Sequence, residues 1–200
     1  MIDYNNWQNV FIIIILIVSI YIVHIYYDNK DHEYVKANNG KSYRVQIKPD
    51  NKKSANLLGT AIDRIKLLLD HLKKSEMHDI RTKTLINRFK PENITENKID
   101  EMNNGVTSYT INKGESIVVC LRQKNHEFVT INTLMYVIIH ELGHICDLTS
   151  QQHDSKFWEN FEWLLSEAIN IGVYNYIDYS EDEEPYCGIT ITSNIIDDKK

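Results

Sequence analysis

Residues 140–144 read HELGH, which is the stretch of this 200-residue sequence with the clearest chemical potential. Residues four apart on a helix share one face, so His140 and His144 can both direct a ring nitrogen at one metal ion. Glu141 is rotated by about 100° from His140, which lets it reach a water that the ion activates. The motif predicts a zinc site in which Glu141 is the general base for attack on a carbonyl carbon.

Two histidines leave a zinc ion under-coordinated, so another residue must supply a third ligand. His153 is the strongest candidate from the sequence. The intervening LTSQQ (148–152) offers a break after the motif helix, and Asp154–Ser155 is a typical helix start. The aromatic pair Phe157–Trp158 would then pin the following helix to the core and hold the His153 ring in place.

Three carboxylates remain as alternatives for the third ligand. Glu162 and Glu167 lie on the next predicted helix, at a distance from the motif that suits a glutamate ligand. Asp147 shares a helical face with His140, but the two are separated by about 10 Å along the axis, which a tetrahedral ion spans poorly.

Two helices and a strand must position these groups. The motif helix is expected from about Thr133 to Leu148, and its apolar LMYVII run (134–139) predicts that it is buried. The next helix carries an apolar face that includes Phe157 and Phe161. Residues 116–122 (SIVVCLR) read as a strand, which is either an ordinary core strand or, as in zinc peptidases of this general plan, a cleft wall that pairs with an extended substrate by strand addition; one strand can be both.

Fewer elements are predicted in the first half of the chain. A short strand is expected over 42–47 and a helix over 54–74, capped by Ser54. Residues 76–105 read as irregular, with a short helix at about Leu85–Phe89.

The N-terminal part of the chain predicts a membrane anchor. Residues 10–27 contain no Asp, Glu, Lys or Arg and span about 27 Å as a helix, close to the thickness of a hydrocarbon core. Residues 1–9 also lack Lys and Arg, whereas four basic residues follow within about 20 positions of the anchor: Lys30, Lys36, Lys41 and Arg44. The positive-inside rule therefore predicts a cytosolic C-terminal domain.

The sequence thus divides into five parts. These are a tail (1–9), an anchor (10–27), a juxtamembrane segment (28–53), a metal-binding domain (54–191) and a charged tail (192–200).

Charge and cysteine content restrict the partners and the compartment. The formal net charge of −6 disfavours a nucleic-acid-binding surface, so no nucleic acid partner is expected. Three cysteines without a repeated spacing do not indicate a disulfide framework, which favours a reducing compartment. Cys120 and Cys187 are expected to be small core residues.

Several blocks resemble the WLM and SprT-like (Spartan-like) zinc metallopeptidases, in the form found in large DNA viruses. The blocks are SYTINKGESIVVCLR (108–122), INTLMYVIIHELGHI (131–145) and EPYCGITI (184–191), with His153 and Phe157–Trp158 between the last two. The resemblance covers residues 107–191 well and 43–72 more loosely. It implies an α+β zincin-like fold, with a small sheet packed on the zinc-binding helix. It also implies Zn²⁺ as cofactor, His140, His144 and His153 as zinc ligands, Glu141 as catalytic base and a peptide or protein as substrate.

Other readings of the site stay open. Cellular members of this group act on proteins crosslinked to DNA, but the acidic charge and the apolar N-terminus of this chain do not fit that role. Tyr186 is either an oxyanion or substrate contact near the zinc, or a packed loop tyrosine. The principal alternative to a peptidase is a catalytically idle zinc domain in a membrane assembly or virion. A zinc hydrolase acting on a bond other than a peptide is a further possibility.

Overall fold

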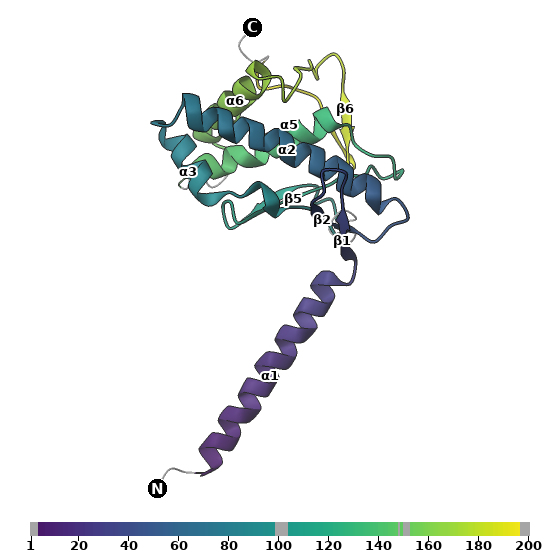
Figure 1. Cartoon of the computed structure of the whole chain (residues 1–200), viewed down its shortest axis with the longest axis vertical. Coiled ribbons are helices and arrows are strands. Elements are labelled where there is room, and N and C mark those ends of the chain that lie inside the picture. Colours follow the sequence, from purple (N-terminus) through teal and green to yellow (C-terminus); the bar gives the residue numbers. More distant parts are fainter. Residues whose placement is uncertain (1–3, 99–103, 148, 150–152, 197–200) are drawn as a thin grey trace.

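The first element is a long helix that projects away from the rest of the chain (Figure 1). The computed structural model describes the whole chain except residues 1–3, 99–103, 148, 150–152 and 197–200. Helix α1 (Tyr4–Asn29) contains the predicted apolar segment, and its stretch Trp7–Tyr27 is long and apolar enough to cross a membrane. None of this stretch is buried against the protein, so its apolar side chains have no protein core to cover them.

A hairpin and a long helix follow α1. Strand β2 (Ser42–Gln46) lies within the predicted strand, while its antiparallel partner β1 (His32–Lys36) was not predicted. Helix α2 (Asn51–Ser75) begins a turn earlier than expected. The prediction that Ser54 caps it is therefore wrong, because Ser54 is fully buried inside the helix. The apolar face of α2 provides a large part of the core.

A three-stranded sheet lies beside these helices. Helix α3 (Ile80–Arg88) is longer than predicted, and the turn η1 (Pro91–Asn93) connects it to the sheet. The strand order is β3-β5-β4, with bounds β3 (Ile94–Glu96), β4 (Tyr109–Ile111) and β5 (Ser116–Val119). Strand β3 is parallel to β5 and β4 is antiparallel to it. Because β5 has neighbours on both sides, it cannot add a substrate strand, and the prediction that it does so is wrong.

Two helices carry the motif and the residues that support it. Helix α5 (Ile131–Cys146) starts at a cap in which the Thr130 side chain accepts from the Thr133 amide. The expected end at Leu148 lies outside the described residues. Helix α6 (Ser155–Asn170) is capped as predicted, because the Asp154 carboxylate accepts from the Phe157 amide. A Cβ at Gly143 would lie 3.2–3.3 Å from Phe157 and Phe161 side-chain atoms, so glycine permits the close approach of α5 and α6.

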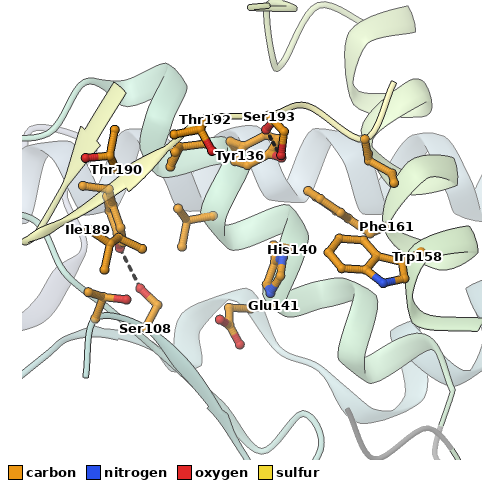
Figure 2. A pocket seen from close by; sticks show the side chains of 15 residues that line it. Ser108, Tyr136, His140, Glu141, Trp158, Phe161, Ile189, Thr190, Thr192 and Ser193 are labelled. Atoms are coloured by element: carbon orange, nitrogen blue, oxygen red, sulfur yellow. Dashed lines mark hydrogen bonds between the residues drawn. The ribbon is translucent and has the colours of Figure 1, made fainter. Parts of the chain in front are cut away.

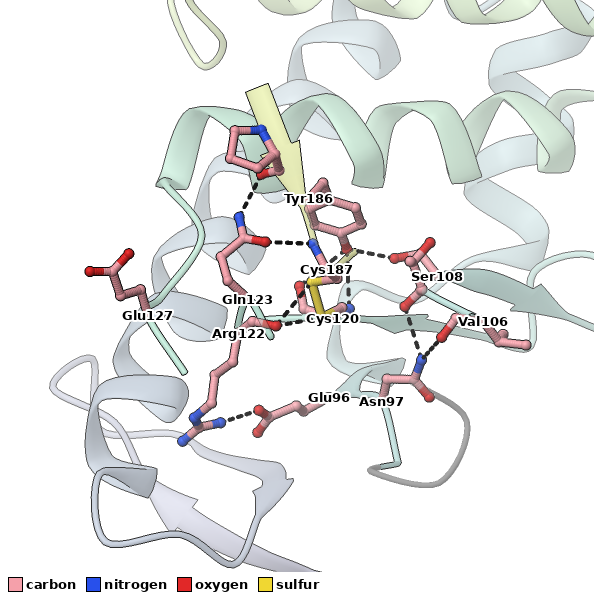
Figure 3. The surroundings of a disulfide bond; sticks show 12 residues. Glu96, Asn97, Val106, Ser108, Cys120, Arg122, Gln123, Glu127, Tyr186 and Cys187 are labelled. Atoms are coloured by element: carbon pink, nitrogen blue, oxygen red, sulfur yellow. Dashed lines mark hydrogen bonds and ion pairs between the residues drawn. A yellow bond between two sulfur atoms is a disulfide. The ribbon is translucent and has the colours of Figure 1, made fainter. Parts of the chain in front are cut away.

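The last described elements form a small hairpin, β6 (Glu184–Tyr186) and β7 (Ile189–Ile191). Cys187, at its turn, is disulfide-bonded to Cys120 at the end of β5 (Figure 3). Both cysteines are buried in the core, as predicted, but the expectation that they are unpaired is wrong. They are 67 positions apart in sequence, so spacing gave no indication of the pairing. The fold class, α+β with a small sheet beside the motif helix and one N-terminal apolar helix, is confirmed.

Candidate metal centre and active site

Three histidine side chains converge at the end of α5. His140 and His144 project from the helix, and His153 comes from the segment just before α6. One ring nitrogen of each lies within 4.8 Å of the others, and the Nε2 atoms of His140 and His153 are 3.0 Å apart. A tetrahedral ion with bonds of about 2.0–2.1 Å places its ligand atoms roughly 3.3–3.4 Å apart, so small shifts of the rings would bring all three nitrogens to one ion.

Aromatic side chains of α6 contact all three of these rings. Phe157 is buried and stacks on His144, with ring centroids 4.1 Å apart. Trp158 stacks on His153 at 5.5 Å and remains 40% exposed, so it supports the histidine rather than pinning the helix to the core. Phe161 contacts His140 edge-on. The predicted role of this aromatic cluster in holding the His153 ring agrees with these contacts.

The surroundings of His140 and His144 favour the neutral form of these two histidines. Burial lowers the pKa of His140 to about 3, and the neighbouring His144 and His153 add to this effect. The pKa of His144 falls to about 4, again mainly because of burial. A metal binds the neutral imidazole, so the lowered pKa values of His140 and His144 and the convergence of the three rings fit a zinc ion with a fourth position left open for water or substrate.

The carboxylates considered as alternative ligands point elsewhere or stay apart from the cluster. The Glu167 carboxylate is 2.7 Å from Nε2 of His71, a residue of α2. The Asp147 carboxylate accepts hydrogen bonds from the backbone amide and the hydroxyl of Thr149. Glu162 does not belong to the histidine cluster within the described part of the chain.

Glu141 is a buried carboxylic acid beside the cluster. Its side chain is 6% exposed, and its Oε2 accepts a 2.8 Å hydrogen bond from the Thr110 hydroxyl. Burial raises the pKa of Glu141 to about 7, and the bond from Thr110 opposes that rise. A carboxyl group that titrates near neutrality can both accept and return a proton, as a general base requires.

Thr110 is a site residue that the sequence reasoning missed. It lies on β4, the edge strand, and reaches α5 across 31 positions of sequence. A single threonine in a three-residue strand carries no motif, so only the pairing of β4 with β5 brings it to Glu141.

Tyr186 lies close to the site but its hydroxyl is already engaged. The side chain is 1% exposed, and burial raises its pKa above the usual value. The hydroxyl is 2.6 Å from Oγ of Ser108, and both backbone polar groups of Cys120 lie 3.1 Å from it (Figure 3). It would have to exchange one of these partners to donate to an oxyanion.

Two hollows meet at Glu141. The smaller, of about 340 Å³, is lined by the three histidines, by residues of β4 and by Lys113. The larger, of about 630 Å³, lies between α5, α6 and the C-terminal hairpin, and His140 and Glu141 are part of its lining (Figure 2). The candidate base therefore has access both to the metal position and to a larger cavity.

Comparison with known proteins places this architecture in a family. The WLM domain family matches residues 38–184. "Uncharacterized protein R325" of Acanthamoeba polyphaga mimivirus is 35% identical over 170 residues, which cover 82% of this chain and 84% of that protein.

Two solved structures are also similar, both of Wss1 from Saccharomyces cerevisiae. The first is 22% identical with a TM-score of 0.48, covering 64% of this chain and 86% of the other. A mutant of the same protein is 23% identical with a TM-score of 0.47, covering 64% and 87%. The extent of the domain match and the identity to the mimivirus protein show that this chain belongs to the WLM family of metalloproteases.

Proposed function

We propose that this chain is a zinc-dependent peptidase that hydrolyses peptide bonds of a protein or peptide substrate. The observation that carries the proposal is the convergence of His140, His144 and His153 within 4.8 Å, with the buried carboxyl group of Glu141 beside them. Membership of the WLM family supports the same reaction class.

In this proposal each side chain of the site has a separate role in metal binding, proton transfer or positioning. His140, His144 and His153 would hold a zinc ion, which when bound supplies Lewis acidity and makes water a better nucleophile. Glu141 would accept a proton from the attacking water and return it to the leaving amine. Thr110 would fix the orientation of the Glu141 carboxylate. Tyr186 remains a candidate oxyanion or substrate contact.

The edge strand β4 offers the route for substrate. It pairs with β5 on one side only in the described sheet, and residues 108–110 line the hollow that contains the histidines. An extended peptide could add to this edge strand by backbone hydrogen bonding, which would bring its carbonyl groups past the metal position. We therefore assign strand addition to β4 in place of β5.

We further propose that residues 10–27 anchor the protein in a membrane. Support comes from the length, composition and exposure of the stretch Trp7–Tyr27. A cleaved signal sequence would share this composition. The core includes Tyr43 and Val45, and Asn194 is fully buried, so we propose that the folded domain begins at the β1–β2 hairpin and continues at least through Asn194 rather than ending at 191.

A catalytically idle zinc domain is the alternative that the geometry favours less. A structural zinc site closes with four protein ligands and needs no base. Here three imidazoles converge beside an open hollow, and a buried carboxyl group with a pKa of about 7 faces it.

Zinc-dependent turnover tests the proposal. The full chain, purified in detergent, is incubated with a mixture of unstructured proteins, and fragments are identified by mass spectrometry. We expect cleavage that stops on treatment with a chelator and returns when zinc is added. Zinc binding without any cleavage across the mixture would favour the idle domain.

A further inference from the structure

The cavity of about 630 Å³ beside Glu141 is formed largely by residues that have no role in metal binding or proton transfer (Figure 2). One side is formed by α5, including Tyr136 and Val137, and by Trp158 and Phe161 of α6. The opposite side is formed by the C-terminal segment 189–195. A volume of this size lies within the roughly 300–1,000 Å³ of pockets that bind small organic ligands, so it can admit the largest amino-acid side chain.

The C-terminal wall lies outside the part of the chain that matches the WLM domain. That match ends at residue 184, whereas the wall consists of residues 189–195. The shape of this cavity therefore depends in part on residues beyond the end of the domain match.

The wall is tied down at several points, so the cavity is already formed before a ligand binds. The disulfide between Cys120 and Cys187 attaches the start of the segment to the end of β5. The Tyr136 hydroxyl, on α5, donates to the carbonyl of Ser193 at 3.1 Å. Asn194 is fully buried, and its side chain donates to the Ile177 carbonyl at 2.9 Å.

The lining is apolar and hydroxylated rather than charged. Among the described residues that line the cavity, the acidic and basic side chains are His140 and Glu141, which belong to the catalytic site. The other polar groups are the hydroxyls of Ser, Thr and Tyr and the indole N–H of Trp158. A charged ligand group would lose its hydration here without gaining a partner, which is strongly unfavourable, whereas an apolar or aromatic group would be favoured.

The cavity also lies at the right place for a residue next to the reacting bond. Val137 precedes Glu141 by one helical turn on the same face of α5. Glu141 lines both this cavity and the hollow of the three histidines. A peptide with its carbonyl at the histidine cluster can therefore place an adjacent side chain between α5 and the C-terminal wall.

We propose that this cavity is a specificity pocket for a large uncharged side chain, aromatic or branched aliphatic, on a substrate residue that flanks the scissile bond. The inference rests on the proposed peptidase function and names the class of substrate that it prefers.

Direct binding tests the pocket without requiring turnover. The probes are blocked peptides that differ at one position, which is Phe, Leu, Ala, Asp or Lys. Their dissociation constants are measured by calorimetry with the zinc-loaded, full-length Glu141→Gln protein, and their kcat/KM values with the parent. We expect the Phe and Leu peptides to have dissociation constants at least tenfold lower, and kcat/KM values at least tenfold higher, than the Asp and Lys peptides. Equal values, or a preference for a charged side chain, would overturn the proposal.

Narrowing the cavity provides a second test. Val137→Trp introduces a larger side chain from the α5 wall. It should lower the Phe-to-Ala preference, which is the ratio of kcat/KM for the Phe peptide to that for the Ala peptide, at least tenfold. Ile191→Trp narrows the cavity from the opposite, C-terminal wall. It is the variant to measure if Val137→Trp does not fold. The control is Ile80→Trp, because Ile80 is 72% exposed on α3 and does not line the cavity. An unchanged Phe-to-Ala preference in a folded cavity variant would overturn the pocket.

The outcomes separate the pocket from the peptidase function. Selective binding without cleavage supports the pocket and rejects the peptidase, whereas cleavage without side-chain preference rejects only the pocket.

Discussion

Thr110 and Glu141 form the hydrogen bond on which the orientation of the proposed base depends. The Thr110 hydroxyl is the side-chain donor to Oε2 of Glu141, at 2.8 Å. A hydrogen bond to a charged group contributes roughly 1.5–3 kcal/mol. If that amount is lost in the transition state, Thr110→Val should lower kcat roughly 10- to 100-fold, with KM and zinc content near those of the parent.

The matched control is Thr110→Ser, which keeps the hydroxyl and removes only a methyl group. We expect it to retain most of the parent kcat. A Thr110→Val protein with full kcat, or a Thr110→Ser protein as impaired as Thr110→Val, would show that the hydroxyl does not position Glu141.

The lowered pKa values of His140 and His144 predict how metal-free protein responds to acid. Between about pH 6.5 and pH 5 the unfolded chain protonates both histidines, while the folded chain, with pKa values of about 3 and about 4, does not. Stability is therefore lost as pH falls. Glu141 acts in the opposite direction, because its folded pKa of about 7 exceeds its unfolded value. The destabilisation from His140 and His144 together exceeds the opposing effect of Glu141, so the net free energy of unfolding falls from pH 6.5 to pH 5.

Urea unfolding of the chelator-treated protein at pH 6.5 and pH 5 measures this effect. We expect a lower midpoint at pH 5, and a smaller difference between the two pH values in His140→Gln/His144→Gln. An identical pH dependence in that double variant would show that the histidines are not the source.

At the scale of elements, the Cys120–Cys187 disulfide joins the sheet to the C-terminal hairpin. The bond closes a loop with a sequence separation of 67, so its reduction should lower the free energy of unfolding by roughly 2–4 kcal/mol. Denaturant unfolding with and without a thiol reductant measures the change. Cys120→Ala/Cys187→Ala is the control and should not respond to reductant. A parent protein that is fully reduced yet equally stable would contradict the expectation.

The sequence predicted those parts of the site that are encoded locally. Histidines at i and i+4 and the Asp154 cap depend on helical geometry, so they could be read without a structure. Thr110 and the Cys120–Cys187 pair could not, because each contact joins segments distant in sequence through the sheet. The extra turn at the start of α2 was missed because residues 51–53 are polar and carry no apolar period.

At the scale of the whole molecule, the question is which side of the membrane the domain faces. Two observations give opposite answers. The excess of Lys and Arg after the apolar helix favours the cytosol. The disulfide removes the argument for a reducing compartment and is typical of an oxidising one.

The sequence contains a reporter that decides between these topologies. Asn93-Ile94-Thr95 is an N-glycosylation sequon, and Asn93 is exposed. If the domain is cytosolic, Asn93 stays unmodified when the protein is produced in a eukaryotic cell with a secretory pathway. A glycosidase-sensitive mass shift that disappears in Asn93→Gln would place the domain in the lumen or outside.

The central claim is that three histidines hold zinc while Glu141, which is not a ligand, performs the proton transfer. Its most direct test measures zinc content and peptide cleavage on the same samples of parent, Glu141→Gln and His153→Ala. We expect Glu141→Gln to keep one zinc per chain and lose nearly all cleavage, and His153→Ala to lose zinc and cleavage together. Parent-like cleavage by Glu141→Gln, or full zinc occupancy in His153→Ala, would contradict the assigned roles.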